Sequence, residues 1–154
     1  LKPFWVQACL LEEAPTNASV PTTVFQSSGL SAPNAQAMRC LHLLIKHQNS
    51  RNPVSRRTGQ STSGVTMEAA QQEMDGYITQ LKAVDPAKLE GAFRAACLAR
   101  SDCGSYAQEG DLGDFESGAM MKPFEEAVLA TEVGQMSAGH FETDSGTHII
   151  YRLG

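Results

Sequence analysis

Hydrophobic and polar positions divide the chain into short elements, of which the first is an aliphatic run at residues 39–47. The run is short and is flanked by polar residues, which predicts a buried strand. Successive side chains of a strand point to opposite faces. One face would then hold Cys40, His42, Leu44 and Lys46, and the other Leu41, Leu43 and Ile45.

Helical spacing begins after a polar loop at residues 48–64. Thr66 is a good N-cap residue, and apolar residues then recur every three or four positions, which predicts a helix through about Val84. Asp85-Pro86 joins a capping residue to a proline at the first helical position and predicts a second helix. Its buried stripe would be Leu89, Ala92, Phe93, Ala96 and Cys97.

Glycine becomes frequent in the last third of the chain, and the predicted elements become shorter. Residues 110–115 indicate a turn entering a strand, and Pro123 begins a short helix. Two further strands are predicted near Met136–Phe141 and Thr147–Arg152, joined by a turn at residues 144–146. This order of one strand, about three helical segments, a strand, a helix and a final strand pair predicts an α+β domain with a mostly antiparallel sheet.

The beginning of the chain differs from the rest. Residues 1–37 hold four of the seven prolines and many Ser, Thr and Ala residues, without a helical or strand period. We expect residues 1–37 to form a flexible extension and residues 38–154 to form one domain. With 42% apolar residues the chain can bury a core. No apolar run approaches the roughly 18 residues of a membrane span, so no membrane partner is expected.

The formal net charge of −5 argues against general binding to nucleic acid. This charge is unevenly distributed, because residues 39–67 hold five basic residues and no acidic one, whereas residues 68–154 hold six basic and fifteen acidic residues. A basic segment within an acidic protein indicates either a solvated loop or a site for one compact anion.

The four cysteines, Cys9, Cys40, Cys97 and Cys103, form no CxxC pair. Two disulfides are possible, but nothing marks a core-poor scaffold that would need them, so a reducing cytoplasmic or nuclear location is expected. Cys40-x-His42 could be half of a metal site, yet no second ligand pair has the usual spacing. The sequence therefore predicts no metal and no cofactor.

Three side chains are candidates for chemistry besides the basic loop: His42 in the first strand, Cys103 after the second helix, and His148 in the last strand. Each also has a structural explanation, because a strand histidine is commonly a hydrogen-bonded core residue and a single cysteine is commonly inert packing. Two histidines with a cysteine would also suit a thiol hydrolase.

Five motifs connect these candidates: LHLLIKH at 41–47, SDC followed by Gly-Ser at 101–105, GDLGDF at 110–115, MMKPFEEAV at 120–128 and TDSGTHIIYR at 143–152. In order and spacing, from about Arg39 to Leu153, the chain resembles the parvulin-type peptidyl-prolyl cis-trans isomerases. It is most similar to the Pin-type branch, which acts on phosphoserine- or phosphothreonine-proline bonds. The resemblance implies the parvulin (FKBP-like) fold, a four-stranded, mostly antiparallel sheet surrounded by about four helices.

The resemblance also implies roles for individual residues. Three apolar residues would form the pocket for the proline ring, namely Leu112, Met120 and Phe124. A network at the reaction site, with the histidines at its floor and the thiol facing the peptide bond, would consist of His42, His148, Cys103, Ser145 and Thr143. Rotation about an amide breaks no bond, so a non-covalent role for the thiol is expected, with covalent attack as a formal rival.

By the same resemblance, Lys46 and Arg51 would bind the substrate phosphate. Pin-type enzymes commonly have two adjacent arginines in this loop, whereas Asn52 follows Arg51 here, so Arg56 or Arg57 is the candidate replacement. The implied partners are phosphorylated Ser/Thr-Pro proteins, bound by a monomer.

Other positions depart from the pattern of the branch. Arg100 stands where an aromatic residue is common before SDC, and Met121 replaces a polar residue often found beside the pocket. The segment 138–142 is one residue longer than usual, which leaves Phe141 without an assigned role. The first 37 residues also lack the paired-tryptophan pattern of a WW module, since Trp5 is the single tryptophan.

Three alternatives stay open at this point. The chain could be a phosphopeptide-binding module with degenerate catalysis, or a general parvulin without phosphate preference. It could also be a hydrolase that uses a Cys-His pair, which predicts a covalent acyl-enzyme.

Overall fold

A computed structural model describes residues 37–154 of the chain. The predicted extension at residues 1–37 therefore lies outside the described residues, apart from Ala37. The first strand begins at Met38, where the domain was predicted to start.

The described residues form four strands, three α-helices and one 3₁₀-helix. In chain order these are β1 (Met38–Ile45), α1 (Met67–Lys82), α2 (Pro86–Arg100), the 3₁₀-helix η1 (Gly104–Gln108), β2 (Asp111–Phe115), α3 (Lys122–Leu129), β3 (Phe141–Thr143) and β4 (Gly146–Arg152). The strands form one sheet in the order β2-β1-β4-β3, and every pair is antiparallel. The predicted α+β class and four-stranded sheet are confirmed.

Both long helices begin where the sequence predicted. The Thr66 hydroxyl accepts a hydrogen bond from the Ala69 N–H at 3.1 Å, and the Asp85 carboxylate accepts one from the Ala87 N–H at 2.9 Å. Each cap satisfies a donor that the first turn of a helix leaves without a partner.

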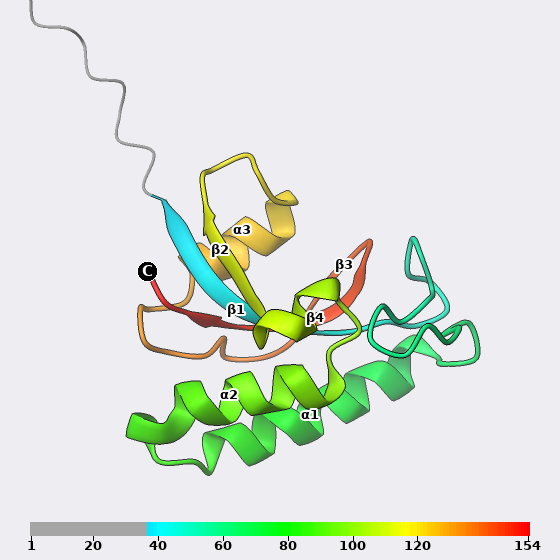
Figure 1. The fold of residues 1–154 in the computed structure, drawn as a ribbon, viewed down its shortest axis with the longest axis horizontal. Helices are drawn as coiled ribbons and strands as arrows, with labels where there is room; N and C mark the ends of the chain where they lie inside the picture. The colour runs from blue at the N-terminus through cyan, green and yellow to red at the C-terminus, as the bar shows by residue number, and fades with distance from the viewer. Residues whose placement is uncertain (1–36) are drawn as a thin grey trace, which may run out of the picture. The chain divides into compact units, whose positions relative to one another are not determined.

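Alternation along β1 separates two apolar clusters, one on each face of the sheet. The helices α1 and α2 lie on one side of the sheet and α3 lies on the other (Figure 1). On one face Leu41, Leu43 and Ile45 pack with α1 and α2, around the fully buried Met74 and Phe93. On the opposite face, α3 covers a second cluster that contains Met38, Cys40, Phe115, Phe124, Val128 and Ile150. His42 and His148 share the α3 face with Cys40 and Ile150, because they are two residues away from them on the same strands.

The prediction of a strand at Met136–Phe141 is wrong, because β3 occupies Phe141–Thr143 instead. Residues 134–137 do run beside β4, but irregularly: Met136 forms an isolated bridge with Tyr151, and the Ser137 N–H bonds to the Ile150 carbonyl. The Ser137 hydroxyl also accepts from the Ile150 N–H at 3.3 Å. The Ser137 hydroxyl takes the place of a backbone carbonyl as the partner of Ile150. Along this edge of β4, regular hydrogen bonding therefore begins only at β3.

Within residues 37–154, no helix is both long enough and apolar enough to cross a membrane.

Candidate functional site

An apolar cavity of about 260 Å³ opens on the α3 face of the sheet. The residues predicted for the proline pocket and for the reaction network all border it. They are Leu112, Met120, Phe124, His42, His148, Cys103, Ser145 and Thr143, with Arg51, Ala119 and Met121 at its edge. The fold thus assembles in one place residues that are more than 100 positions apart in the chain.

Aromatic rings form the base of this cavity. The Phe124 ring meets His42 and His148 edge-on, with ring centroids 5.6 Å apart in both pairs. Phe141, which had no assigned role, stacks on His148 with centroids 5.3 Å apart and an interplanar angle of 12°. Because rings pack on both sides of His148, its imidazole has little freedom to turn.

A chain of polar contacts crosses the sheet beneath the cavity. The Nδ1 atoms of His42 and His148 lie 3.3 Å apart, and His42 Nε2 lies 2.9 Å from Ser105 Oγ. At the other end, His148 Nε2 lies 2.8 Å from Thr143 Oγ1, which also accepts a bond from the Ser145 N–H at 3.1 Å. Both histidines therefore have a partner at each ring nitrogen.

The His148 imidazole is uncharged in this arrangement. Burial, together with the charge that His42 can carry, lowers the pKa of His148 well below its ordinary value. A contact between two Nδ1 atoms needs one of them protonated and the other not. Either Nδ1 atom can carry that proton, so either histidine can be the donor in the contact between the two rings.

Cys103 lies at the N-cap position of η1, at the mouth of the cavity. Burial opposes ionisation of its thiol, but interactions with His42 and Ser105 outweigh burial and lower its pKa to about 6. The thiolate is therefore the dominant form at neutral pH. A fixed negative charge at the rim of an apolar pocket can act on the electron distribution of an amide without forming a bond to it.

A second cavity, of about 360 Å³, adjoins the first and is cationic. Arg51, Cys103 and Ser145 border both cavities, and Lys46 and Arg56 line the second. Of the two candidate replacements for the missing arginine, the structure brings only Arg56 to this cavity. Arg57 is half-buried in the same loop and lines neither cavity.

The basic loop is folded around the Lys46 side chain, which the sequence did not indicate. Lys46 is only 6% exposed, and its ammonium donates to the carbonyls of Asn52 and Val54 at 2.9 and 2.8 Å. Val54 forms a bridge with Ser61 that closes the outer part of the loop. Burial and the nearby charge of Arg56 lower the pKa of Lys46. The ammonium can still offer a third N–H to an anion in the cavity.

Sequence reasoning missed several residues that support the site. Ser105 ends the histidine chain, and its position two residues after Cys103 within the SDCGS motif was the available signal. Ser101 is fully buried, and its hydroxyl accepts from the Leu44 and Cys103 N–H groups at 3.2 and 3.4 Å. The Glu142 carboxylate accepts hydrogen bonds from His47, from Thr147 and from Gln71 on α1, and no local sequence pattern indicates these contacts.

In the part of the chain that the structure describes, no group of three or more His, Cys, Asp or Glu residues is placed to hold a metal ion. Cys40 belongs to the core, where burial raises the pKa of its thiol to about 12. Cys40, Cys97 and Cys103 are free thiols.

Residues 42–153 match a known family, Rotamase, described as the PPIC-type PPIase domain. The matched segment starts at His42 and includes every residue that borders the apolar cavity. The chain belongs to the PPIC-type peptidyl-prolyl isomerases. The predicted isomerase activity is confirmed by this membership.

Named relatives of this isomerase are of the Pin1 type. The peptidyl-prolyl cis-trans isomerase NIMA-interacting 1 of Theileria annulata is 47% identical over 116 residues, covering 75% of this chain and 79% of the relative. Pin1 of Malus domestica is 41% identical over 129 residues, covering 81% and 100%. The solution structure of TbPIN1 superposes with a TM-score of 0.66 at 51% identity, covering 78% of this chain and 99% of that one. The predicted parvulin fold is confirmed.

The geometry of the isomerase suits its reaction. Rotation about an X-Pro amide has a barrier of about 18–20 kcal/mol, and it is lowered by groups that favour the twisted state over the planar one. An apolar cavity removes water from the amide, whose planar form is the more polar. We expect the proline ring to occupy the space between Leu112, Met120 and Phe124, with the amide facing Cys103.

We expect the Cys103 thiol to titrate near pH 6, below the 9.0 of an ordinary thiol. Because the pKa is lower in the folded state, the thiolate stabilises the fold fully above about pH 9, and this contribution is lost as the pH falls toward 6. Alkylation by iodoacetamide, localised by peptide mass spectrometry, measures the titration. Its rate at Cys103 should reach half of its maximum near pH 6.

Cys97 is the matched control for this titration. It is fully buried, and burial raises the pKa of its thiol, so it should resist alkylation until the protein unfolds. The variant Cys103→Ser should lack the part of the pH dependence of stability that the thiolate causes. A Cys103 midpoint near pH 9 would contradict the thiolate assignment.

Proposed function

We propose that this isomerase acts on phosphoserine- and phosphothreonine-proline bonds of phosphoproteins, and that Arg51 and Arg56 are the principal ligands of the phosphate. The observation that carries the proposal is the cationic cavity directly beside the apolar one. A phosphorylated residue immediately precedes the proline in such a substrate. A phosphate site must therefore adjoin the proline pocket, as this cavity does.

Charge and chemistry support the same ligand. A phosphate brings about −1.5 to −2 charges and three acceptor oxygens, and arginine can engage it with two parallel hydrogen bonds. Arg51 and Arg56 are both exposed and line the cavity, so their guanidinium groups are available. Lys46 contributes its charge, while two of its N–H groups hold the loop.

The backbone holds both arginines close to the reaction site. The Arg51 N–H donates to the Asp144 carbonyl at 2.6 Å, and the Arg56 N–H donates to the Asp102 carbonyl at 3.0 Å. Arg56 Cδ would lie 3.3 Å from a Cβ placed on Gly104, so the glycine leaves room for the arginine beside η1. Arg56 can thereby supply the charge that Asn52 does not.

Exchange NMR on a phosphoThr-Pro peptide and its unphosphorylated twin tests the proposal. The wild type should accelerate exchange in the phosphopeptide much more than in the plain peptide. A hydrogen bond to a charged group contributes about 1.5–3 kcal/mol, so Arg51→Ala or Arg56→Ala should each lower kcat/KM on the phosphopeptide by about 10- to 100-fold. Both variants should retain the wild-type rate on the plain peptide.

Two variants control for charge and for position in the loop. Lys88→Ala removes an exposed cation at the start of α2, and Arg57→Ala removes the loop arginine that lines neither cavity. Neither should change the preference for the phosphopeptide. Equal wild-type rates on the two peptides would refute the phosphate specificity and leave the isomerase activity intact.

A further inference from the structure

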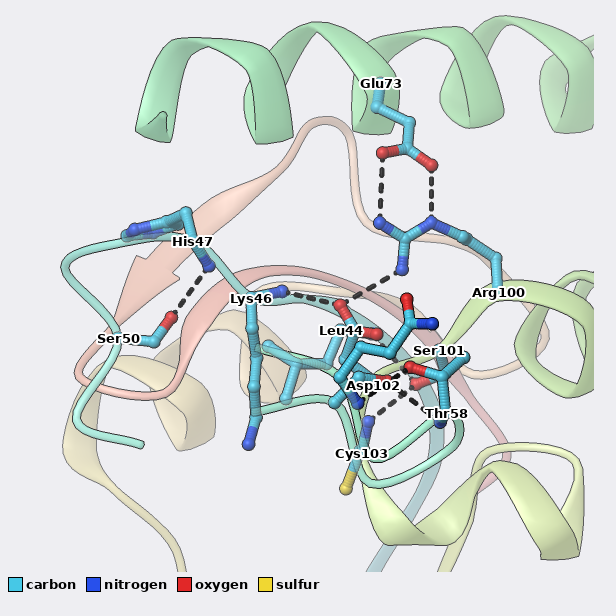
Figure 2. A network of polar contacts seen from close by, with 12 residues as sticks. Leu44, Lys46, His47, Ser50, Thr58, Glu73, Arg100, Ser101, Asp102 and Cys103 are labelled. Atoms are coloured by element: carbon cyan, nitrogen blue, oxygen red, sulfur yellow. Dashed lines mark hydrogen bonds and ion pairs between the residues drawn. The ribbon is translucent and has the colours of Figure 1, made fainter. Parts of the chain in front are cut away.

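Arg100, the last residue of α2, connects two carboxylates that come from different elements. Its Nε and Nη2 atoms donate to both oxygens of Glu73 on α1, with Nη2 3.0 Å from Oε2. Its Nη1 atom lies 3.0 Å from Asp102 Oδ2. Figure 2 shows the guanidinium between the two acids, above the strand end that carries Lys46.

Asp102 in turn holds both sides of the cationic cavity. Its Oδ2 atom accepts from the Lys46 backbone N–H at 3.0 Å, and its own N–H donates to the Leu44 carbonyl at 2.8 Å. Its carbonyl accepts from the Arg56 N–H at 3.0 Å. One residue therefore sets the position of the end of β1 and of the loop segment that bears Arg56.

The Asp102 carboxylate needs a cation beside it. Asp102 is 2% exposed, and an ionised carboxylate is buried at high cost unless it is paired and hydrogen-bonded. Burial works against the charge of Arg100, yet hydrogen bonds to Glu73 and Asp102 raise the pKa of its guanidinium above the ordinary value. Arg100 therefore stays charged in this setting.

The same pairing limits the effect of Asp102 on its other neighbours. An unneutralised carboxylate at this position would oppose the approach of a phosphate dianion to Lys46 and Arg56. Arg100 offsets that charge, and its two bonds to Glu73 tie the whole unit to α1. An aromatic residue in place of Arg100 could neither offset the charge of Asp102 nor form the two hydrogen bonds to Glu73.

We propose that Arg100 is a positioning residue for phosphate recognition, which neutralises Asp102 and ties it to α1 so that Lys46 and Arg56 stay at the cationic cavity. The inference rests on the proposed phosphate specificity. It extends that proposal to a residue that touches neither cavity. A residue that only stabilised the fold would affect both kinds of peptide alike.

Kinetics of Arg100→Gln on the two peptides test the inference. The phosphopeptide KM should rise about tenfold, while kcat on it and kcat/KM on the plain peptide stay near the wild-type values. If Arg100 acts through Asp102, then Arg100→Gln should have little further effect in an Asp102→Asn background. Glu73→Gln, which leaves the Asp102 contact in place, should raise the phosphopeptide KM less than Arg100→Gln does.

Amide hydrogen exchange of the protein without substrate adds a readout that does not depend on the reaction. In Arg100→Gln the Lys46 and Arg56 N–H groups, which donate to Asp102, should exchange faster, while the core amides keep their protection. Arg94→Gln is the matched control, because Arg94 is also on α2, is ion-paired with Glu90, and is similarly exposed at 25% against 21%. It should leave both readouts unchanged.

The outcomes separate the two proposals. If the wild type prefers the phosphopeptide and Arg100→Gln keeps both that preference and the protection of Lys46 and Arg56, this inference is overturned and the proposed function stands. An equal loss of kcat/KM on both peptides would also overturn it, because it would mark a structural role. A wild type without any preference for the phosphopeptide would overturn both.

Discussion

Replacing Phe124 with alanine should lower isomerase kcat/KM by about 100-fold or more, on phosphorylated and plain peptides alike. The ring walls the apolar cavity and meets both His42 and His148 edge-on, so the substitution enlarges the pocket and frees the two imidazoles. Phe124 is 5% exposed, and truncating such a ring also costs about 3–5 kcal/mol of stability. Activity should therefore be measured by exchange NMR at a temperature where circular dichroism shows the variant to be folded.

Phe115→Ala separates the two consequences. Phe115 belongs to the same apolar cluster and is 7% exposed, but it does not border the cavity. The Phe115→Ala variant should lose about as much stability as Phe124→Ala does, but it should keep most of its isomerase activity per folded molecule. Phe124→Leu gives a milder test in case the alanine variant does not fold, with a smaller loss of rate. An unchanged kcat/KM for folded Phe124→Ala would exclude the ring from the proline pocket.

Gly110→Ala should destabilise the fold by about 2–5 kcal/mol, although it adds only one methyl group. Gly110 has a φ of +85°, and a Cβ there would lie 2.5 Å from Cys97 Sγ and 2.8 Å from the His42 carbonyl oxygen. The Gly110 carbonyl accepts from the His42 N–H at 2.9 Å, so this left-handed backbone lies directly beside the histidine chain. Left-handed conformation costs about 1–2 kcal/mol, and overpacking adds about 1–3 kcal/mol.

Gly113→Ala provides a control with the same kind of backbone. Its φ is +70°, but a Cβ at Gly113 would have nothing within 4 Å. Urea unfolding should show only the conformational cost there, about 1–2 kcal/mol. Adding Cys97→Ala to Gly110→Ala should recover part of the loss, since the His42 carbonyl still crowds the position. Equal losses at the two glycines would contradict the steric explanation.

Local patterns predicted those parts of the fold that depend on neighbouring residues. Alternation in β1 assigned His42 to the face opposite Leu41, and capping residues located the starts of both long helices at Thr66 and Asp85. These signals are readable because a strand or a helix end is determined by contacts within a few positions. The strand at Met136–Phe141 was misplaced because a buried side chain, Ser137, replaces a backbone partner there.

By itself, the sequence determined the order of the elements, the faces of β1 and the motifs that the family match later supported. Only the tertiary structure decided that Arg56 rather than Arg57 reaches the cationic cavity, and that the ammonium of Lys46 holds its own loop. Only the tertiary structure joined Arg100 to Glu73 and Asp102, and showed that the Nδ1 atoms of His42 and His148 meet at 3.3 Å. Such contacts depend on the path of the whole chain, because residues distant in sequence meet only after the sheet has formed.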